Sequence, residues 1–497
     1  MTGLDLVIIA LYLAGVVLSG ALLSARQKTT AQYFLGGRKI PWWAIAASIV
    51  ATETSTITFI SVPGIAYSRG GDLTFLQLPM GYMVGRIAIS ILFIPLYFKG
   101  ELLTVYQLLT ERFGRGVKAL AASLFVTMRT VGDGIRLLLT SIVLGAVTTA
   151  FLPGLRAEDA VPAAIIVLGV VMILFTLWGG MEAVIWIEVV QLGIYLTGAI
   201  AAAVILASKV DGGLSGALAL AAAHGKLRLF DFSFLGQGSY ATFWAGVVGG
   251  GFLVMSTHGT DQYLVQRYLC TSEPRKASAA LLSSGVFVLF QFTLFLAIGI
   301  LLFAFYRPFE AAGYATGPAA APFLRGDGVF PDFITHHLPS PLPGLVVAAI
   351  LAAALSSSLN AIAATSVNDL YRPLRPNRDD AHYLWLGKRL TVAAGILQIL
   401  VALALRTSPS SALDKALAVA SLLNGPVLGV FLLGSFTKSA AGPRAALLGM
   451  SAGLAVNLWM RFGTSMPWPW LAAIGSLTTL IVGTLAGRLW PEDAPRP

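Results

Sequence analysis

Residues 51–58 read Ala51-Thr-Glu-Thr-Ser-Thr-Ile-Thr58 and lie inside an apolar stretch that runs from 42 to 68. Five hydroxyl side chains and one carboxylate therefore fall at the centre of a segment long enough to cross a bilayer. Such a run favours a helix that unwinds to present carbonyl and hydroxyl oxygens to an ion or a solute. The alternative, in which the hydroxyls bond back to their own helix, leaves Glu53 unexplained.

Composition extends this membrane interpretation to the whole chain. Of 497 residues, 57% are hydrophobic and 11% are charged, whereas about 25% are charged in soluble domains. The expected fold class is an all-α integral membrane protein. Thirteen apolar stretches are predicted to span the bilayer: 4–24, 42–68, 73–98, 116–150, 161–178, 181–208, 240–266, 277–305, 342–370, 383–405, 413–436, 443–460 and 467–487.

The N-terminal stretch, the single cysteine and the net charge limit the processing, the metal sites and the partners expected for this chain. The stretch 4–24 lacks a basic start and a small-residue cleavage site, so we expect a retained helix and not a signal peptide. The single cysteine, Cys270, excludes an internal disulfide and a Cys-rich metal site. The net charge of +10 is interpreted as cytoplasmic loop charge and not as nucleic-acid binding.

Loop charge also predicts the orientation. With the N-terminus outside, Lys and Arg favour the cytoplasmic segments by roughly 2:1, which is the bias of inner-membrane proteins. We expect a multi-pass protein of the plasma (inner) membrane with a cytoplasmic C-terminus, working as a monomer. No phosphate-binding G-x-x-x-x-G-K-[ST] motif is present, so nothing suggests a primary pump.

Several other predicted spans carry polar groups. The span 342–370 contains Ser356-Ser357-Ser358-Leu-Asn360, which offers neutral oxygens for an alkali cation, although small residues there also allow close helix packing. The span 240–266 contains Gly249-Gly-Gly251, a plausible break, followed by His258, which is weak evidence for a site by itself.

Charged residues inside spans are costly and are usually paired or functional. Glu188 is expected about two turns into the membrane. Arg129 and Asp133 are four residues apart and can pair on one helix face, and Asp133 and Arg136 are three apart. One arginine is then left for Glu53, for Glu188 or for an anionic solute. A purely internal salt-bridge cluster is the alternative.

Four motifs, in order, resemble the sodium/solute symporter family. They are a cytoplasmic loop and first core helix, a helix 4–5 junction, a D-Q-x-x-V-Q-R segment and a tenth core helix. The matching residues are Tyr33-Phe-Leu-Gly-Gly-Arg38-Lys-Ile-Pro-Trp-Trp43 with 58–67, Trp178-Gly-Gly with Ala183-Val-Ile-Trp186, Asp261-Gln262-Tyr-Leu-Val-Gln266-Arg267, and Gly425-Pro426 with Phe431-Leu-Leu-Gly434-Ser-Phe-Thr-Lys438.

The resemblance implies a leucine-transporter (LeuT) fold in a single transmembrane domain, 1–497. One extra helix (4–24) would precede two five-helix repeats of inverted topology, 42–208 and 240–436, and two further helices would follow in 443–487. The repeat is not visible in the sequence itself. The implied activity is sodium-coupled symport of a small organic solute, such as a carboxylate or a sugar, by alternating access.

The resemblance also implies one sodium site. It would join the carbonyls of Ala51, Thr54 and Ala353 to the hydroxyls of Ser356 and Ser357. The serine run is about three residues shorter than the family pattern, and alignment from Asn360 would instead place Ala353 and Ala354 at the hydroxyl positions. Glu188 stands where the family usually has Asp, and it could steady the cation or relay its release.

The solute site implied by the resemblance lies near the midplane, among core helices 1, 2, 3, 6 and 10. A buried arginine there would favour a carboxylate, whereas Glu53 would favour a hydroxylated or cationic solute; the residues leave a slight preference for an anion or a polyol. The matching positions are Glu53, Ser55, Thr58, Gln77, Arg129, Arg136, Thr257, His258 and Asn424.

Three rival functions remain at the level of sequence. The same fold could couple to protons through Glu53 or Glu188, or not couple at all, which the alternative serine register would favour. An intramembrane serine protease would use Ser215 of Gly213-Leu-Ser-Gly216 with His224, but these residues fall in or beside an expected extracellular loop. A channel or a sensor is the third, and the chain carries no appended signalling domain. No enzymatic function is expected.

Overall fold

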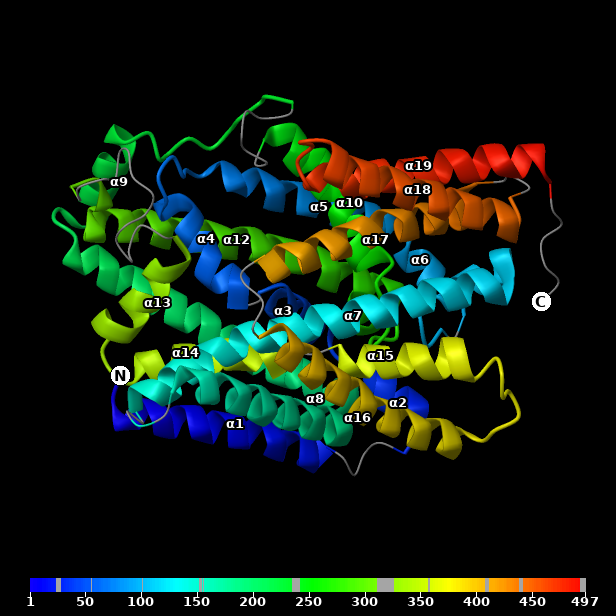
Figure 1. Ribbon diagram of the computed structural model, residues 1–497, viewed down its shortest axis with the longest axis horizontal. Coiled ribbons are helices and arrows are strands. Elements are labelled where there is room, and N and C mark those ends of the chain that lie inside the picture. The colour runs from blue at the N-terminus through cyan, green and yellow to red at the C-terminus, as the bar shows by residue number, and fades with distance from the viewer. Residues whose placement is uncertain are drawn as a thin grey trace.

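The computed structural model describes residues 1–23, 28–54, 56–100, 102–151, 154, 156–234, 242–310, 326–355, 358–406, 411–437 and 441–491. The described chain is all helical, which confirms the predicted fold class. Most of its long helices run roughly along the longest axis of the molecule, with the N-terminus near one end and the C-terminus at the other (Figure 1).

Several predicted spans are single unbroken helices. Each begins and ends within a few residues of the prediction: α1 Gly3–Leu23, α12 Pro274–Tyr306, α16 Asp380–Leu405, α17 Ser411–Phe436, α18 Pro443–Gly463 and α19 Pro469–Leu489. Within the described residues, eight helical segments are long and apolar enough to cross a membrane. The predicted total of thirteen crossings stays a prediction.

Other spans are bent or joined end to end. The helix α5 (Gln77–Leu92) continues into the short α6 (Ile94–Tyr97). The helix α7 (Gln107–Phe151) is kinked at Gly114, and α8 (Ala157–Lys209) is kinked at Gly180. Gly180 separates two predicted spans, and its φ of 56° is readily adopted only by glycine. The chain therefore turns there without a separate loop.

The span 42–68 is interrupted, as predicted. The helix α3 (Trp42–Glu53) ends where Thr54 leaves helical geometry, with φ −79° and ψ 75°, and α4 begins at Thr56 and ends at Tyr67. The span 342–370 is also interrupted, between α14 (Leu342–Leu355) and α15 (Leu359–Thr365), and a π-helical turn, Ser366–Tyr371, follows.

The span 240–266 breaks at a different place from the one predicted. A π-helical segment, Ala245–Gly250, runs directly into α10 (Gly251–Gly259), so the break predicted at the triple glycine was wrong. The interruption is at Thr260 and Asp261, before α11 (Gln262–Tyr268), where the Asp261 carboxylate accepts a hydrogen bond from Tyr263 N. The glycines serve close packing instead: a Cβ on Gly249 would lie 2.8 Å from the Pro469 carbonyl.

Within the described residues, three short α-helices lie outside the predicted spans. They are α2 (Thr30–Leu35), α9 (Gly213–Ala223) and α13 (Gly326–His337). The helices α9 and α13 lie toward the end of the molecule that carries the N-terminus, whereas α2 lies on the other side of the middle (Figure 1). This distribution agrees with the expected alternation of loops between two faces of a membrane.

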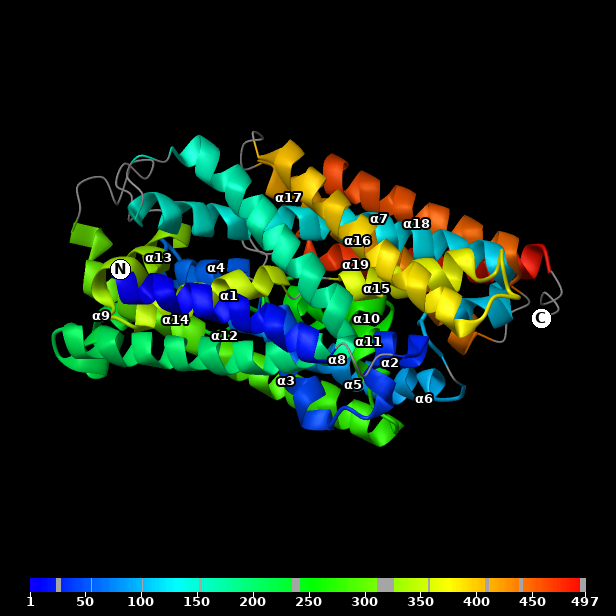
Figure 2. The ribbon, with the colours of Figure 1, turned by 90° about the horizontal axis from the view of Figure 1, so that it is seen from below.

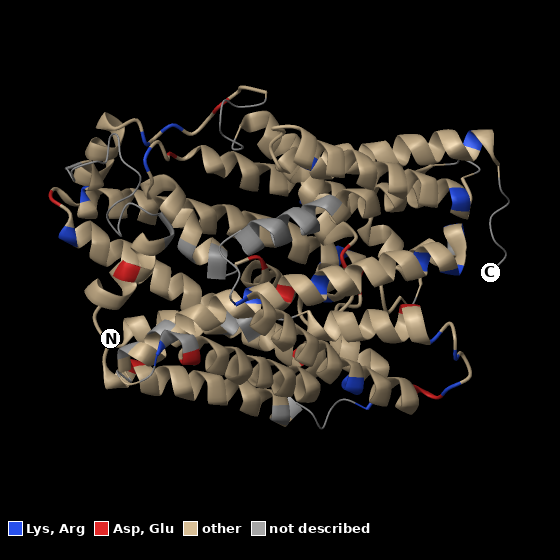
Figure 3. Ribbon diagram, viewed as in Figure 1, with Lys and Arg blue, Asp and Glu red and all other residues tan. Residues whose placement is uncertain are grey.

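Hydrogen bonds between loops confirm that grouping. Near the N-terminal end, Thr2 Oγ1 lies 2.9 Å from Ser340 Oγ, and Arg228 Nε lies 2.9 Å from Asp72 Oδ2. At the other end, Arg38 donates to the Leu102 carbonyl. Figure 3 shows charges at both ends and a small group near the middle of the molecule. Which end faces the outside stays a prediction.

The extra helices lie around a core. Helix α1 packs on α8 and α14, while α18 and α19 pack on each other and on α17 (Figures 1 and 2). The arrangement fits one additional helix before the core and two after it. The interrupted helices α3/α4 and α10/α11 lie inside this frame, which is where polar side chains can meet away from lipid.

Candidate functional site

The break after α3 places Glu53 beside two basic groups. The Glu53 Oε1 atom contacts Arg86 Nη2 from α5 and His258 Nε2 from α10. His258 Nδ1 lies 3.0 Å from Thr257 Oγ1, which also donates to the Leu253 carbonyl at 3.0 Å. Since Arg86 is fully buried and belongs to a different helix, this cluster ties three elements together at the interruption.

Three polar atoms in this region lack a hydrogen-bond partner among the described residues. They are Glu53 Oε2, Arg86 Nη1 and Gln291 Nε2, all buried. Gln291 lies on α12, and its Oε1 accepts a hydrogen bond of 2.8 Å from Thr54 Oγ1. Buried polar groups without partners are costly, so a polar solute or water that reached them would gain hydrogen bonds.

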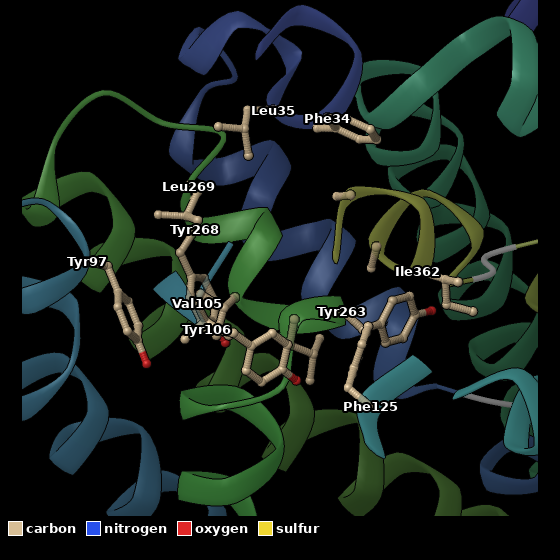
Figure 4. Close-up of a cluster of buried hydrophobic side chains, with 14 of the residues drawn as sticks. Phe34, Leu35, Tyr97, Val105, Tyr106, Phe125, Tyr263, Tyr268, Leu269 and Ile362 are labelled. Atoms are coloured by element: carbon tan, nitrogen blue, oxygen red, sulfur yellow. The ribbon is translucent and has the colours of Figure 1, made fainter. Parts of the chain in front are cut away.

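The interruption before α11 holds a second charge pair. Arg129 of α7 directs Nε and Nη2 to one oxygen of Asp261, Oδ2, while Oδ1 accepts from Tyr263 N. The Tyr263 ring lies between two guanidinium groups, with ring-centroid distances of 4.6 Å to Arg129 and 4.5 Å to Arg267. Figure 4 shows Tyr263 close to Phe125 and Ile362 in the apolar cluster that surrounds it.

Glu188 has a fully engaged carboxylate. It accepts hydrogen bonds from Ser48 Oγ, from Thr52 Oγ1 at 3.1 Å and from Arg267 Nη2 at 2.6 Å. Both charged side chains are 1% exposed. The pair joins α3, α8 and α11, and it fixes the half-helix that ends at Glu53.

Asp133 of α7 reaches the other interrupted span. Its Oδ2 accepts hydrogen bonds from Ser358 N, at 3.0 Å, and from Ser358 Oγ. Its Oδ1 lies 3.8 Å from Arg136 Nη1. The residue before α15 is therefore held by a side chain from another helix.

These contacts correct the predicted charge pairing. Arg129 pairs with Asp261, and not with Asp133 as its spacing predicted. The arginine that the spacing left for Glu53, Glu188 or an anionic solute serves neither glutamate, because Glu53 contacts Arg86 and Glu188 contacts Arg267. The solute alternative stays a prediction. Helical spacing detects partners on the same helix, whereas three of these four pairs join different helices.

Other predicted site residues take varied positions. Gln77 is buried and bonds to the Thr74 carbonyl and to Asp231 N, both at 3.0 Å. Thr58 Oγ1 lies 3.4 Å from the Glu53 carbonyl, and Asn424 lines a small cavity together with Asp261. Ser55, Ser356 and Ser357 lie outside the described residues.

The expected sodium ligands on α3 lie at a helix end. Ala51 is in the last turn of α3, whose carbonyls lack intrahelical partners as a class, and Thr54 is the first non-helical residue. Ala353 lies in the last turn of α14. Both helix ends therefore offer carbonyl oxygens of the kind that a hard cation binds.

Sequence reasoning assigned no role to Arg86 or Gln291. Arg86 is the one charged residue inside the predicted span 73–98, which is a usable signal, because a single charge there calls for a partner elsewhere. Gln291 gave no comparable signal.

The protease alternative finds no support, since Ser215 Oγ and His224 Nδ1 lie 2.8 and 2.9 Å from carbonyls of their own helical segment.

Comparisons with known proteins identify the family of this chain. The model of the sodium:solute symporter family matches residues 33–453. A sodium/sialic acid symporter of Aliivibrio fischeri is 31% identical over 97% of this chain and 92% of its own length. The human sodium/iodide cotransporter is 29% identical over 91% of this chain and 68% of its own length.

A solved structure has the same architecture. It is the substrate-bound, outward-open state of a Na+-coupled sialic acid symporter, which is 28% identical, superposes with a TM-score of 0.85, and covers 98% of both chains. The architecture is the LeuT fold. Relatives named for sodium coupling favour a sodium-coupled transporter over the proton-coupled, uncoupled, channel, sensor and enzyme alternatives.

Proposed function

Because this chain belongs to the sodium:solute symporter family, we propose that the solute it carries with sodium is a small organic anion bearing a carboxylate. Sodium-coupled secondary transport across a membrane is the activity of the family, and it works by alternating access. The proposal concerns which solute is carried and which residues bind it.

The balance of buried charge supports an anion. In the described core, Glu53, Asp133, Glu188 and Asp261 each lie beside one arginine. Among these four carboxylates, none is left over to neutralise an added sodium ion. A cation in this poorly polarisable environment raises the electrostatic free energy, and a solute with one negative charge lowers it again. Sodium and an anionic solute would therefore favour each other's binding.

The main observation behind the proposal is the hydrogen-bond geometry and exposure of Arg129. Both of its hydrogen bonds go to a single oxygen of Asp261, and its side chain keeps 16% exposure while that of Asp261 keeps 3%. The remaining edge of the guanidinium, with Nη1, can donate hydrogen bonds to a second carboxylate in the bidentate geometry that favours arginine over lysine. Arg136, at 22% exposure on the same helix, would assist.

The relatives point the same way. They are named for sialic acid and for iodide, which are both anions at neutral pH. Around the bound carboxylate, the unpartnered atoms of Glu53, Arg86 and Gln291 would take hydroxyl or amide groups of the solute. Thr257, His258, Thr58 and Asn424 would complete the pocket, and Ser55 and Gln77 remain proposed members of it.

The sodium site that we propose uses the carbonyls of Ala51, Thr54 and Ala353 and the hydroxyls of Ser356 and Ser357, with one ion. Glu188 would act indirectly, by holding α3 through Ser48 and Thr52. We also propose that the protein works as a monomer in the plasma (inner) membrane. The loop-charge bias supports the further proposal that its N-terminus lies outside.

The test is uptake into proteoliposomes with an outside-to-inside sodium gradient. Radiolabelled sialic acid, pyruvate, glucose and choline serve as probes, each with and without an inside-negative potential. We expect uptake of a carboxylate only, with Arg129→Gln reducing it at least 100-fold and Arg129→Lys at least 10-fold. One sodium with one monoanion carries no net charge, so the potential should have no effect. Uptake of glucose or choline alone would overturn the anion assignment.

A further inference from the structure

Asp133 uses its two carboxylate oxygens on two different parts of the protein. One oxygen, Oδ2, accepts hydrogen bonds from the backbone N and the hydroxyl of Ser358, and the other, Oδ1, faces Arg136 at 3.8 Å. The residue is 5% exposed, so water replaces neither contact easily. Nothing in the comparisons assigns a role to this residue.

The two residues that the Asp133 carboxylate contacts lie in or beside two different proposed binding sites. Ser358 lies in the interruption between α14 and α15, with φ −77° and ψ 8°, and directly follows the two serines proposed to bind sodium. Arg136 lies on α7, one helical turn beyond Asp133 and two beyond Arg129, which is proposed to bind the solute. The Asp133 carboxylate therefore contacts Arg136, which belongs to the proposed solute site, and Ser358, which follows the serines of the proposed sodium site.

We propose that Asp133 is a positioning residue that couples solute binding to sodium binding. The inference rests on the proposed function. When a solute carboxylate binds near Arg136, the guanidinium is shared and its attraction to Asp133 weakens. The charge of Asp133 then acts more fully on the interruption at Ser358, which favours a cation there. Coupling of this kind is reciprocal, so sodium raises the affinity for the solute by the same factor.

A structural role alone would be a simpler explanation. A carboxylate that accepts from the N–H of a residue at a helix start is a common capping arrangement. Asparagine at position 133 still offers an oxygen to Ser358 but no charge to Arg136. Asp133→Asn therefore preserves the cap and removes the proposed coupling, which separates the two explanations.

The experiment is a double-mutant cycle on sodium affinity, measured on the purified full-length chain by sodium-dependent thermal stabilisation, with potassium as the ionic control. No solute is needed, because Arg136→Gln imitates an arginine neutralised by an anion. We expect Arg136→Gln to tighten apparent sodium binding about fivefold in the parent chain and less than twofold in the Asp133→Asn background. Asp133→Asn alone should weaken sodium binding.

Asp5→Asn is the matched control. Asp5 is also buried, and it accepts a hydrogen bond of 2.9 Å from Gly344 N at the other end of α14, but the described chain places no arginine in an ion pair with it. The fivefold effect of Arg136→Gln should persist in that background.

The possible outcomes distinguish failure of the coupling role of Asp133 from failure of the proposed sodium site. An equal effect of Arg136→Gln in the parent and Asp133→Asn backgrounds would overturn the coupling role and leave the proposed function standing. Absence of any sodium effect on the parent would overturn the proposed sodium site and this inference with it. If Asp133→Asn does not fold, Ser358→Ala replaces it. That variant removes the hydroxyl contact only and should reduce the effect of Arg136→Gln by about half, and an unchanged effect would again refute the coupling.

Discussion

At the end of the molecule that carries the N-terminus, the ammonium of Lys226, with three N–H donors, lies within hydrogen-bond distance of four backbone carbonyls. They belong to Ala66, Tyr67, Ser68 and Gly71, at 2.8 to 3.2 Å, and the Phe303 ring centroid lies 4.4 Å away. The residue closes the C-terminal end of α4, where helix carbonyls lack partners. Burial lowers the pKa of Lys226 to about 8, although Asp72 opposes the shift.

The lowered pKa of Lys226 predicts a pH dependence of stability. The folded chain loses this proton near pH 8, before the unfolded chain does, so the unfolded chain binds more protons between about pH 8 and 10.5. The free energy of unfolding should then rise with pH in that window. Between pH 7 and 9 we expect a gain of about 1 kcal/mol for the parent over Lys226→Met, measured by thermal unfolding in detergent. Parallel pH profiles would refute it.

A second prediction at this scale concerns Glu53 and Arg86. Glu53→Gln leaves the fully buried guanidinium of Arg86 without its counterion, which should cost about 3–5 kcal/mol of stability. The double variant Glu53→Gln/Arg86→Met should recover most of this loss, because no buried charge is then unpaired. Glu273→Gln, which breaks an exposed pair with Lys276, is the control and should change little. Additive losses in the double variant would contradict the pairing.

Among the elements, glycine contacts set how closely helices approach. A Cβ on Gly81 of α5 would lie 1.8 Å from the Gly246 carbonyl oxygen, and one on Gly85 would lie 2.5 Å from that of Gly251. Small residues in this arrangement let membrane helices pack backbone to backbone. The contact holds the π-helical segment and α10 against the helix that carries Arg86, so it also positions the polar cluster at Glu53.

We therefore expect Gly81→Ala to destabilise the protein by about 3 kcal/mol or to abolish folding, since two backbones cannot both move aside. Gly132→Ala on α7 is the control, because no atom lies within 4 Å of its added Cβ. It should be neutral or slightly stabilising, as alanine is the better helix former. Fluorescence-detected size-exclusion chromatography distinguishes the two variants, and an equal monomer yield would refute the packing argument.

For the whole molecule, the proposed sodium site would link the end of α3 to the end of α14. A ligand that binds the folded state alone stabilises it, by about 2.7 kcal/mol at one hundred times its Kd. We expect sodium, and not potassium, to raise the melting temperature of the parent chain. The double variant Ser356→Ala/Ser357→Ala should lose this response, and Ser215→Ala on α9 should keep it. A response that survives in the double variant would exclude the proposed hydroxyl ligands.

Much of the architecture could be predicted because it depends on local physics. Hydropathy alone indicated the helices, since a segment of about 20 apolar residues has few alternatives to a helix in lipid. The unwinding near Glu53 followed from its hydroxyl run. Motifs quoted from the sequence contained Asp261 and Arg267, both of which the structure places in buried ion pairs.

Only the tertiary structure decided which charges meet. Arg86 with Glu53, Arg129 with Asp261, and Arg267 with Glu188 join helices far apart in sequence, and spacing along one helix carries no information about such partners. Sequence also misplaced the break that the structure shows at Thr260. The glycines before it looked like the interruption, but they are helical and pack closely against neighbouring helices. Composition and hydropathy determined that the chain crosses a membrane as helices, whereas packing between helices decided where its buried charges lie.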